Sequence, residues 1–164
     1  MPSEGSTGAD QLIVATVFID MENNALTGEI PAELAGLEAA TSLRLGRNNF
    51  GLTSIPEELY SMVALQELEL FACNVSGPVS PSIGNLTELT LLRLESNALT
   101  GGIPEEVGNL DKLLEISLGN NQLTGQLPSI SALLDLRKSQ TARCVVEVKA
   151  TTRPHRQCSA GGVV

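Results

Sequence analysis

Side chains that could carry chemistry are sparse in this 164-residue chain. The one histidine, His155, lies near the C-terminus, so the rest of the sequence cannot assemble a Ser/His/Asp triad or a histidine-based metal site. Adjacent glutamates at 57–58 and 105–106 are most simply explained as solvated surface, and the sequence contains no phosphate-binding loop or kinase motif. We therefore expect no enzyme activity, no cofactor and no metal ion.

The charged residues are unevenly distributed along the chain. It has 19 acidic and 10 basic residues and a formal net charge of −9, which argues against nucleic acid as a partner because phosphate binding needs a basic face. Six of the basic residues fall in residues 137–164, together with a single acid, Glu147. We predict that 137–164 is a separate basic tail, either a degenerate cap or a disordered segment.

The remainder of the chain is organised by an internal repeat. The pattern L-x-L-x-x precedes a recurring anchor residue, with spacings of 24, 25, 24 and 24 residues between successive anchors. The alternation in L-x-L is that of a short strand with two side chains pointing inward. The anchors are Asn24, Asn48, Cys73, Asn97 and Asn121.

Strands that recur at a fixed register are expected to stack in parallel, about 4.8 Å apart. Each turn of such a coil buries its apolar side only against its neighbours. An inward-facing asparagine can hydrogen-bond backbone groups of the adjoining turn, and Cys73 is small enough to replace it. The segment following Asn48 is one residue longer than the others, so we expect a bulge there.

The motif in "LTLLRLESNALTGGIP" (89–104) resembles the plant-type leucine-rich repeat. Such repeats occur in the ectodomains of receptor-like kinases and receptor-like proteins, and in polygalacturonase-inhibiting proteins. The resemblance covers roughly residues 13–134. It implies an α/β solenoid, a right-handed coil of about five 24-residue repeats with a parallel β-sheet on its concave face.

These observations predict three segments. Residues 1–12 form an N-terminal segment that is uncapped or truncated, since they lack the cysteine of the usual cap; residues 13–136 form the repeat domain, and 137–164 the tail. Within the tail, "CVVEV" at 144–148 could add a strand. Cys144 and Cys158 could form a disulfide in a secreted chain, whereas in a reducing compartment all three cysteines would remain thiols.

Ligand binding in such a scaffold is expected on the outward positions of the concave sheet. Charges of alternating sign along Asp20, Arg44, Glu69 and Arg93 favour mutual neutralisation over ligand recognition. Phe71 is either a contact anchor with a polar rim or an isolated exposed ring. The predicted ligand-binding residues are Arg44, Glu69, Phe71, Arg93 and Glu95.

The resemblance implies a noncatalytic recognition module, (part of) the ectodomain of a receptor-like protein in signalling or defence. Its partner would be a protein, peptide or glycan on the concave face. Two alternatives are an inhibitor of a secreted polysaccharide-degrading enzyme and a structural spacer. We expect an extracellular or cell-surface location: the sequons at Asn85 and Asn74 would make the chain a glycoprotein, and no apolar run approaches the about 18 residues of a membrane span.

Overall fold

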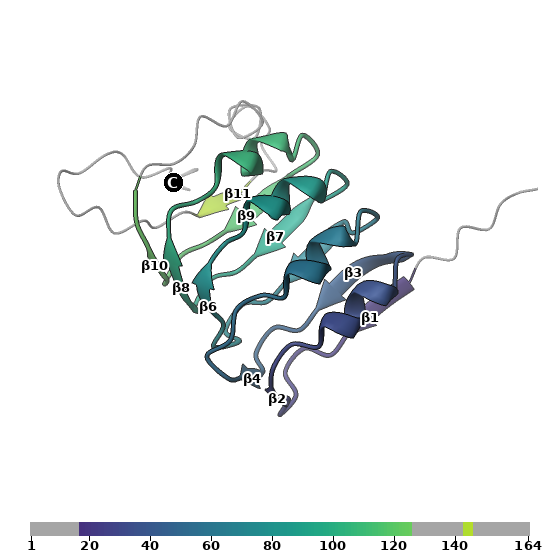
Figure 1. The fold of residues 1–164 in the computed structure, drawn as a ribbon, viewed down its shortest axis with the longest axis vertical. Coiled ribbons are helices and arrows are strands. Elements are labelled where there is room, and N and C mark those ends of the chain that lie inside the picture. The colour runs from purple at the N-terminus through teal and green to yellow at the C-terminus, as the bar shows by residue number, and fades with distance from the viewer. Residues whose placement is uncertain (1–16, 126–142, 146–164) are drawn as a thin grey trace, which may run out of the picture.

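The computed structural model describes residues 17–125 and 143–145. Its elements are short strands alternating with 3₁₀ helices of five residues, drawn in Figure 1. In chain order they are β1 (Val17–Asp20), β2 (Thr27–Gly28), η1 (Ala32–Gly36), β3 (Ala40–Arg44), β4 (Asn49–Phe50), η2 (Glu57–Ser61), β5 (Glu67–Glu69), β6 (Ser76–Pro78), η3 (Pro81–Asn85), β7 (Leu91–Arg93), β8 (Ala98–Gly101), η4 (Glu105–Asn109), β9 (Glu115–Ser117), β10 (Gln122–Leu123) and β11 (Arg143–Val145).

The main sheet confirms the predicted solenoid of parallel strands. Its order is β1-β3-β5-β7-β9-β11, and each pairing is parallel. The inward leucines of successive strands are in register, so that Leu43 lies opposite Leu68 and Leu68 opposite Leu92. The last strand, β11, lies beside β9 and overlaps the segment in which the sequence suggested a further strand.

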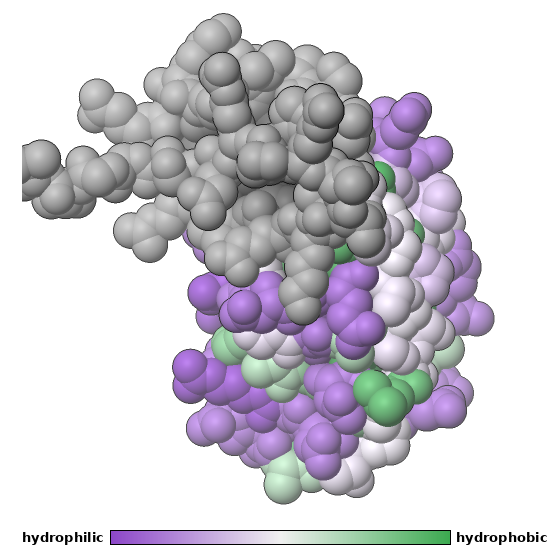
Figure 2. Space-filling model, turned by 90° about the vertical axis from the view of Figure 1, so that its left-hand side faces the viewer, coloured by the Kyte–Doolittle hydropathy of each residue, from purple (hydrophilic) through white to green (hydrophobic). Residues whose placement is uncertain are grey.

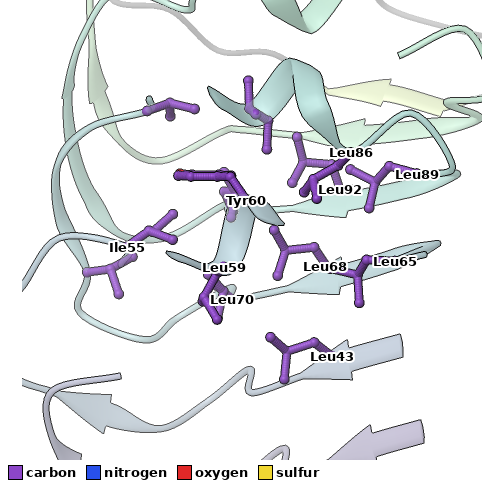
Figure 3. Close-up of a cluster of buried hydrophobic side chains, with 14 of the residues drawn as sticks. Leu43, Ile55, Leu59, Tyr60, Leu65, Leu68, Leu70, Leu86, Leu89 and Leu92 are labelled. Atoms are coloured by element: carbon purple, nitrogen blue, oxygen red, sulfur yellow. The ribbon is translucent and has the colours of Figure 1, made fainter. Parts of the chain in front are cut away.

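The core fills the space between this sheet and the 3₁₀ helices. Leu43, Leu68 and Leu92 point inward from successive strands, and Leu59 and Tyr60 of η2 face them from the other side, as Figure 3 shows. All five side chains are buried. The isolated turns could not bury these residues, so the stack of turns is itself the source of stability.

Each helix begins directly after a proline or a capping serine. Pro31 and Pro104 precede η1 and η4 in extended conformation, and Pro56 precedes η2. The Ser80 side chain accepts a hydrogen bond from the Ser82 N–H at the start of η3. The fixed φ of proline limits the path of the chain as it enters the return segment. The return segments of the described repeats are 3₁₀ helices of five residues.

The anchor asparagines bond neighbouring turns together, as predicted. Asn97 Oδ1 accepts hydrogen bonds from the Cys73 and Val75 N–H groups at 2.9 and 3.1 Å. Its Nδ2 donates to the carbonyls of Leu70 and Leu94 at 2.7 and 3.0 Å. One side chain thus satisfies four backbone groups that would otherwise lack partners in the interior.

The longer second repeat interrupts a secondary sheet on another side of the coil. Strands β2 and β4 pair with each other, and β6, β8 and β10 form a separate sheet. At the break, the Ser76 N–H donates to the Thr53 carbonyl, Leu52 is 70% exposed, and Asn74 takes a φ of +60°. The extra residue is therefore extruded as a bulge. Cys73, next to Asn74, donates its thiol to the Leu45 carbonyl but supplies no amide oxygen as acceptor.

Candidate functional site

The candidate site lies on the outward face of the six-stranded sheet, opposite the 3₁₀ helices. The strand register aligns Asp20 with Arg44, Arg44 with Glu69, and Glu69 with Arg93. Because alternate residues of a strand share a face, a second row on the same face runs through Ser42, Glu67 and Glu115. Charged side chains from successive strands are therefore within reach of one another.

Arg44 forms one half of this surface. Its guanidinium lies 2.7 Å from Glu67, 3.1 Å from Glu69 and 3.9 Å from Asp20. Burial raises the pKa of Glu67, but hydrogen bonds from Arg44 and Ser42 outweigh burial and hold that pKa below its ordinary value. The same hydrogen bond to Glu67 raises the pKa of Arg44, so the pair stays ionised.

Arg93 forms the other half. It lies 3.2 Å from Glu69, 3.5 Å from Glu95 and 3.7 Å from Glu115. Glu69 is only 5% exposed and bridges the two arginines, so a buried carboxylate is held between two cations. The predicted neutralisation along the ladder is therefore present in the geometry.

These seven charged residues make one ion-pair network, with five carboxylates around two guanidinium groups and a formal charge of −3. Its members are Asp20, Arg44, Glu67, Glu69, Arg93, Glu95 and Glu115. Within the described residues, the buried Nε of Arg93 and Oε2 of Glu95 have no hydrogen-bond partner. The network therefore keeps unused bonding capacity at its Arg93–Glu95 end.

Phe71 lies against this network rather than standing alone. The guanidinium carbons of Arg93 and Arg47 are 5.1 and 5.7 Å from the centroid of its ring, within the range of cation–π attraction. A Cβ added to Gly46 would lie 2.4 Å from Cε1 of Phe71, so the ring occupies the space that a side chain at position 46 would fill. The ring is half-buried between two arginines and a glycine.

The structure brings all five predicted ligand-binding residues together. Arg44, Glu69, Arg93 and Glu95 belong to the ion-pair network, and Phe71 packs on Arg93. Sequence reasoning did not assign functional roles to four neighbours: Gly46, Arg47, Glu67 and Glu115. The outward periodicity marks Gly46, Glu67 and Glu115, because they share the face of the ladder. Nothing in the periodicity predicts that Arg47, at a φ of +57°, turns toward Phe71.

The predicted glycosylation acceptors lie elsewhere on the surface. Asn85 ends η3 and Asn74 sits at the bulge, and both are exposed. Both sequons remain predictions. Cys73 is a buried free thiol, and burial raises its pKa. The pairing suggested for Cys144 and Cys158 lies outside the described residues, as do His155 and most of the basic tail.

The described part of the chain offers little for other chemistry. No group of three or more His, Cys, Asp and Glu side chains in residues 17–125 and 143–145 is placed to hold a metal ion. None of the helices in those residues is long and apolar enough to cross a membrane. The outward sheet face presents acidic and basic side chains around one aromatic ring, an arrangement suited to binding.

Comparison with known proteins agrees with this geometry. Residues 88–110 and 112–134 match the Leucine Rich Repeat family. Receptor-like protein 39 of Arabidopsis thaliana is 36% identical over 82 residues, which cover 49% of this chain and 9% of that protein. The described repeats have the leucine-rich-repeat fold, and residues 88–110 and 112–134 match its sequence motif.

Solved leucine-rich-repeat ectodomains superpose on the chain. The plant peptide hormone receptor RGFR1, solved in complex with RGF2, matches with a TM-score of 0.71 at 31% identity, over 80% of this chain and 20% of the receptor chain. A chain of the BIR3–SERK2 complex from Arabidopsis thaliana matches with a TM-score of 0.69 at 28% identity, over 87% of this chain and 73% of that one. The chain thus spans a small part of Receptor-like protein 39 and of RGFR1.

Proposed function

We propose that this leucine-rich-repeat chain is a noncatalytic recognition module of a receptor-like protein, with an extracellular or cell-surface location. Its ligand is a protein or peptide, bound on the outward sheet face, which the family resemblance predicts to be concave. Support comes from its neighbours: RGFR1 is a peptide hormone receptor solved with RGF2, and BIR3 and SERK2 form a complex.

The observation that carries the proposal is the junction of Glu69, Phe71 and Arg93. Arg93 contacts both the buried carboxylate and the ring, so three kinds of contact group are held in one geometry. Binding to side chains already fixed by ion pairs loses less rotamer entropy than binding to free ones. An aromatic and an arginine inside a charged rim are also the residue types that dominate binding energy at protein interfaces.

The experiment is site-directed photo-cross-linking in a secreted protein fraction from plant tissue. A photoreactive amino acid replaces Ser117, which is on the outward sheet face, or Glu58, which is exposed on η2 on the opposite side. The proposal expects a discrete product from position 117 that unlabelled chain suppresses, and no such product from position 58. Equal capture from both positions, or capture that unlabelled chain does not suppress, overturns it.

A further inference from the structure

Aromatic surface is scarce in this chain, so the orientation of a single ring matters for recognition. The sequence has three phenylalanines, one tyrosine and no tryptophan, and of these Phe50 and Tyr60 are buried in the core. On the side of the molecule shown in Figure 2, hydrophobic residues occur only in small separate groups over the described repeats. Among the described aromatic rings, Phe71 alone has cation–π contacts. Because aromatic and arginine side chains dominate the binding energy of protein interfaces, a residue that fixes the Phe71 ring shapes the recognition surface.

Phe71 has a neighbour with a side chain in the following turn and one without in the preceding turn. The Arg47 N–H donates to the Phe71 carbonyl, which places Gly46 beside Phe71 in the preceding turn. The Ala72 N–H donates to the Glu95 carbonyl, which places Glu95 beside Phe71 in the following turn. The space into which the ring can lean therefore lies over Gly46.

The ring lies with one face against this glycine. A Cβ added to Gly46 would be 2.4 Å from Cε1 of Phe71, 2.7 Å from Cδ1 and 2.8 Å from Cζ. Cδ1 and Cζ are the two carbons bonded to Cε1, and a point beyond the edge of the ring would be markedly farther from both of them. The Cβ position is therefore above the ring face. No methyl group fits there, because real Cβ atoms essentially never come within 3.0 Å of another heavy atom.

The flat ring in turn holds two guanidinium groups. The guanidinium carbon of Arg93 is 5.1 Å from the ring centroid, and this side chain also contacts three carboxylates. The guanidinium carbon of Arg47 is 5.7 Å from the centroid, and Arg47 has no ion pair within the described residues. Cation–π attraction is therefore the contact that orients the exposed Arg47, and a displaced ring would release it.

We propose that Gly46 is a positioning residue of the recognition surface. Its missing side chain lets Phe71 lie flat on the sheet, and the flat ring holds Arg47 and Arg93 in place for binding. The inference rests on the function proposed above. A side chain at position 46 lifts the ring from the sheet, which changes the surface that a partner meets without removing any predicted contact residue.

A double-mutant cycle between positions 46 and 71 is the test. Four unlabelled chains compete for the partner that cross-links at position 117: wild type, Gly46→Ala, Phe71→Ala and Gly46→Ala/Phe71→Ala. Gly46→Ala should compete about three- to tenfold more weakly than wild type. In the Phe71→Ala background the same substitution should change competition by less than about twofold, because the methyl group then meets no ring. The matched control is Gly108→Ala in η4, whose Cβ meets nothing within 4 Å, and it should compete as wild type does.

Ring-current shifts test the geometry without a partner. Protons above the face of an aromatic ring are shifted upfield in the NMR spectrum, so a Gly46 α-proton should be shifted upfield in wild type and return to its ordinary position in Phe71→Ala. Circular dichroism checks that each variant is folded. If Gly46→Ala does not fold, Gly46→Ala/Phe71→Ala should regain the fold, because the clash is removed.

The outcomes separate this inference from the proposed function. A product that still forms at position 117, with equal competition by Gly46→Ala and wild type or an equal loss in both backgrounds, would overturn the role of Gly46 and leave the recognition face in place. An unshifted Gly46 α-proton in wild type, or a double variant that stays unfolded, would also overturn that role. No product from position 117 of the otherwise wild-type chain would overturn the proposed function, and this inference with it.

Discussion

Replacing Asn97 with alanine tests how the turns are held together. The substitution removes the acceptor for the Cys73 and Val75 N–H groups and the donor to the Leu70 and Leu94 carbonyls. Each hydrogen bond contributes a net of about 0.5–1.5 kcal/mol, so four bonds bound the loss at about 2–6 kcal/mol. Because Asn97 is half-buried and water reaches some of the freed groups, we expect the free energy of unfolding to fall by about 2–4 kcal/mol.

Asn24 provides the matched control. It is the anchor of the first turn, is exposed, and donates only to the carbonyls of Met21 and Glu22. Water replaces these bonds, so Asn24→Ala should cost less than about 1 kcal/mol. Urea unfolding followed by circular dichroism measures both variants, and hydrogen exchange of the Cys73 and Val75 amides, which should quicken only in Asn97→Ala, locates the effect. Equal destabilisation by the two substitutions, or unchanged exchange at those amides, would show that Asn97 does not hold the neighbouring turns together.

Two further predictions concern buried and crowded positions. Burial raises the pKa of Tyr60, the chain's one tyrosine, from 10.0 to about 12, so absorbance at about 295 nm should titrate about two pH units higher in the folded chain than in urea. Because the pKa of Tyr60 is higher in the folded chain, the contribution of this residue to the free energy of unfolding is fully present below pH 10 and is lost as the pH rises toward 12. A folded-state titration near pH 10 would contradict this. Gly84→Ala should destabilise the chain by about 1–3 kcal/mol, since the added Cβ would lie 2.9 Å from the Glu106 carbonyl oxygen. At the equivalent position of the next turn, the Cβ of Gly108→Ala would meet nothing within 4 Å, so this variant should be neutral or mildly stabilising in thermal unfolding. Similar melting temperatures for the two alanine variants would show that the close approach at Gly84 is relaxed in solution.

Much of the scaffold follows from the sequence because its period is strict. The spacing of Asn48, Cys73 and Asn97 placed the turns, and the L-x-L alternation placed the strands and their inward leucines. The extra residue near Leu52 predicted the bulge, since one added residue cannot keep both neighbouring pairings. The break in the secondary sheet at this point is its consequence.

The details of the candidate site were less predictable. The repeat period predicts which side chains share a face of the sheet, but it does not predict which neighbours a long side chain contacts. Arg44 contacts Glu67 at a shorter distance than Asp20, its neighbour in the ladder, because its flexible stem reaches diagonally across the strands. Likewise, the placement of Phe71 depends on the absence of a side chain at Gly46, a feature of the neighbouring turn.

Recognition of a partner by the outward sheet face can be tested by competition for the partner that cross-links at position 117. Three unlabelled competitors are compared: wild-type chain, Phe71→Ala/Arg93→Ala, and the control Glu88→Ala/Lys112→Ala. The control removes an exposed ion pair, in which Lys112 Nζ lies 2.6 Å from Glu88 Oε2, outside the strands of the sheet. Glu69 keeps its contact with Arg44 in the first variant, so the fold should survive.

Phe71→Ala/Arg93→Ala should compete at least about tenfold more weakly than wild type, since truncating central aromatic and arginine residues at an interface costs about 2 kcal/mol or more. The Glu88→Ala/Lys112→Ala control should compete as well as wild type. Equal competition by all three folded proteins would contradict the claim that the outward sheet face is the recognition surface.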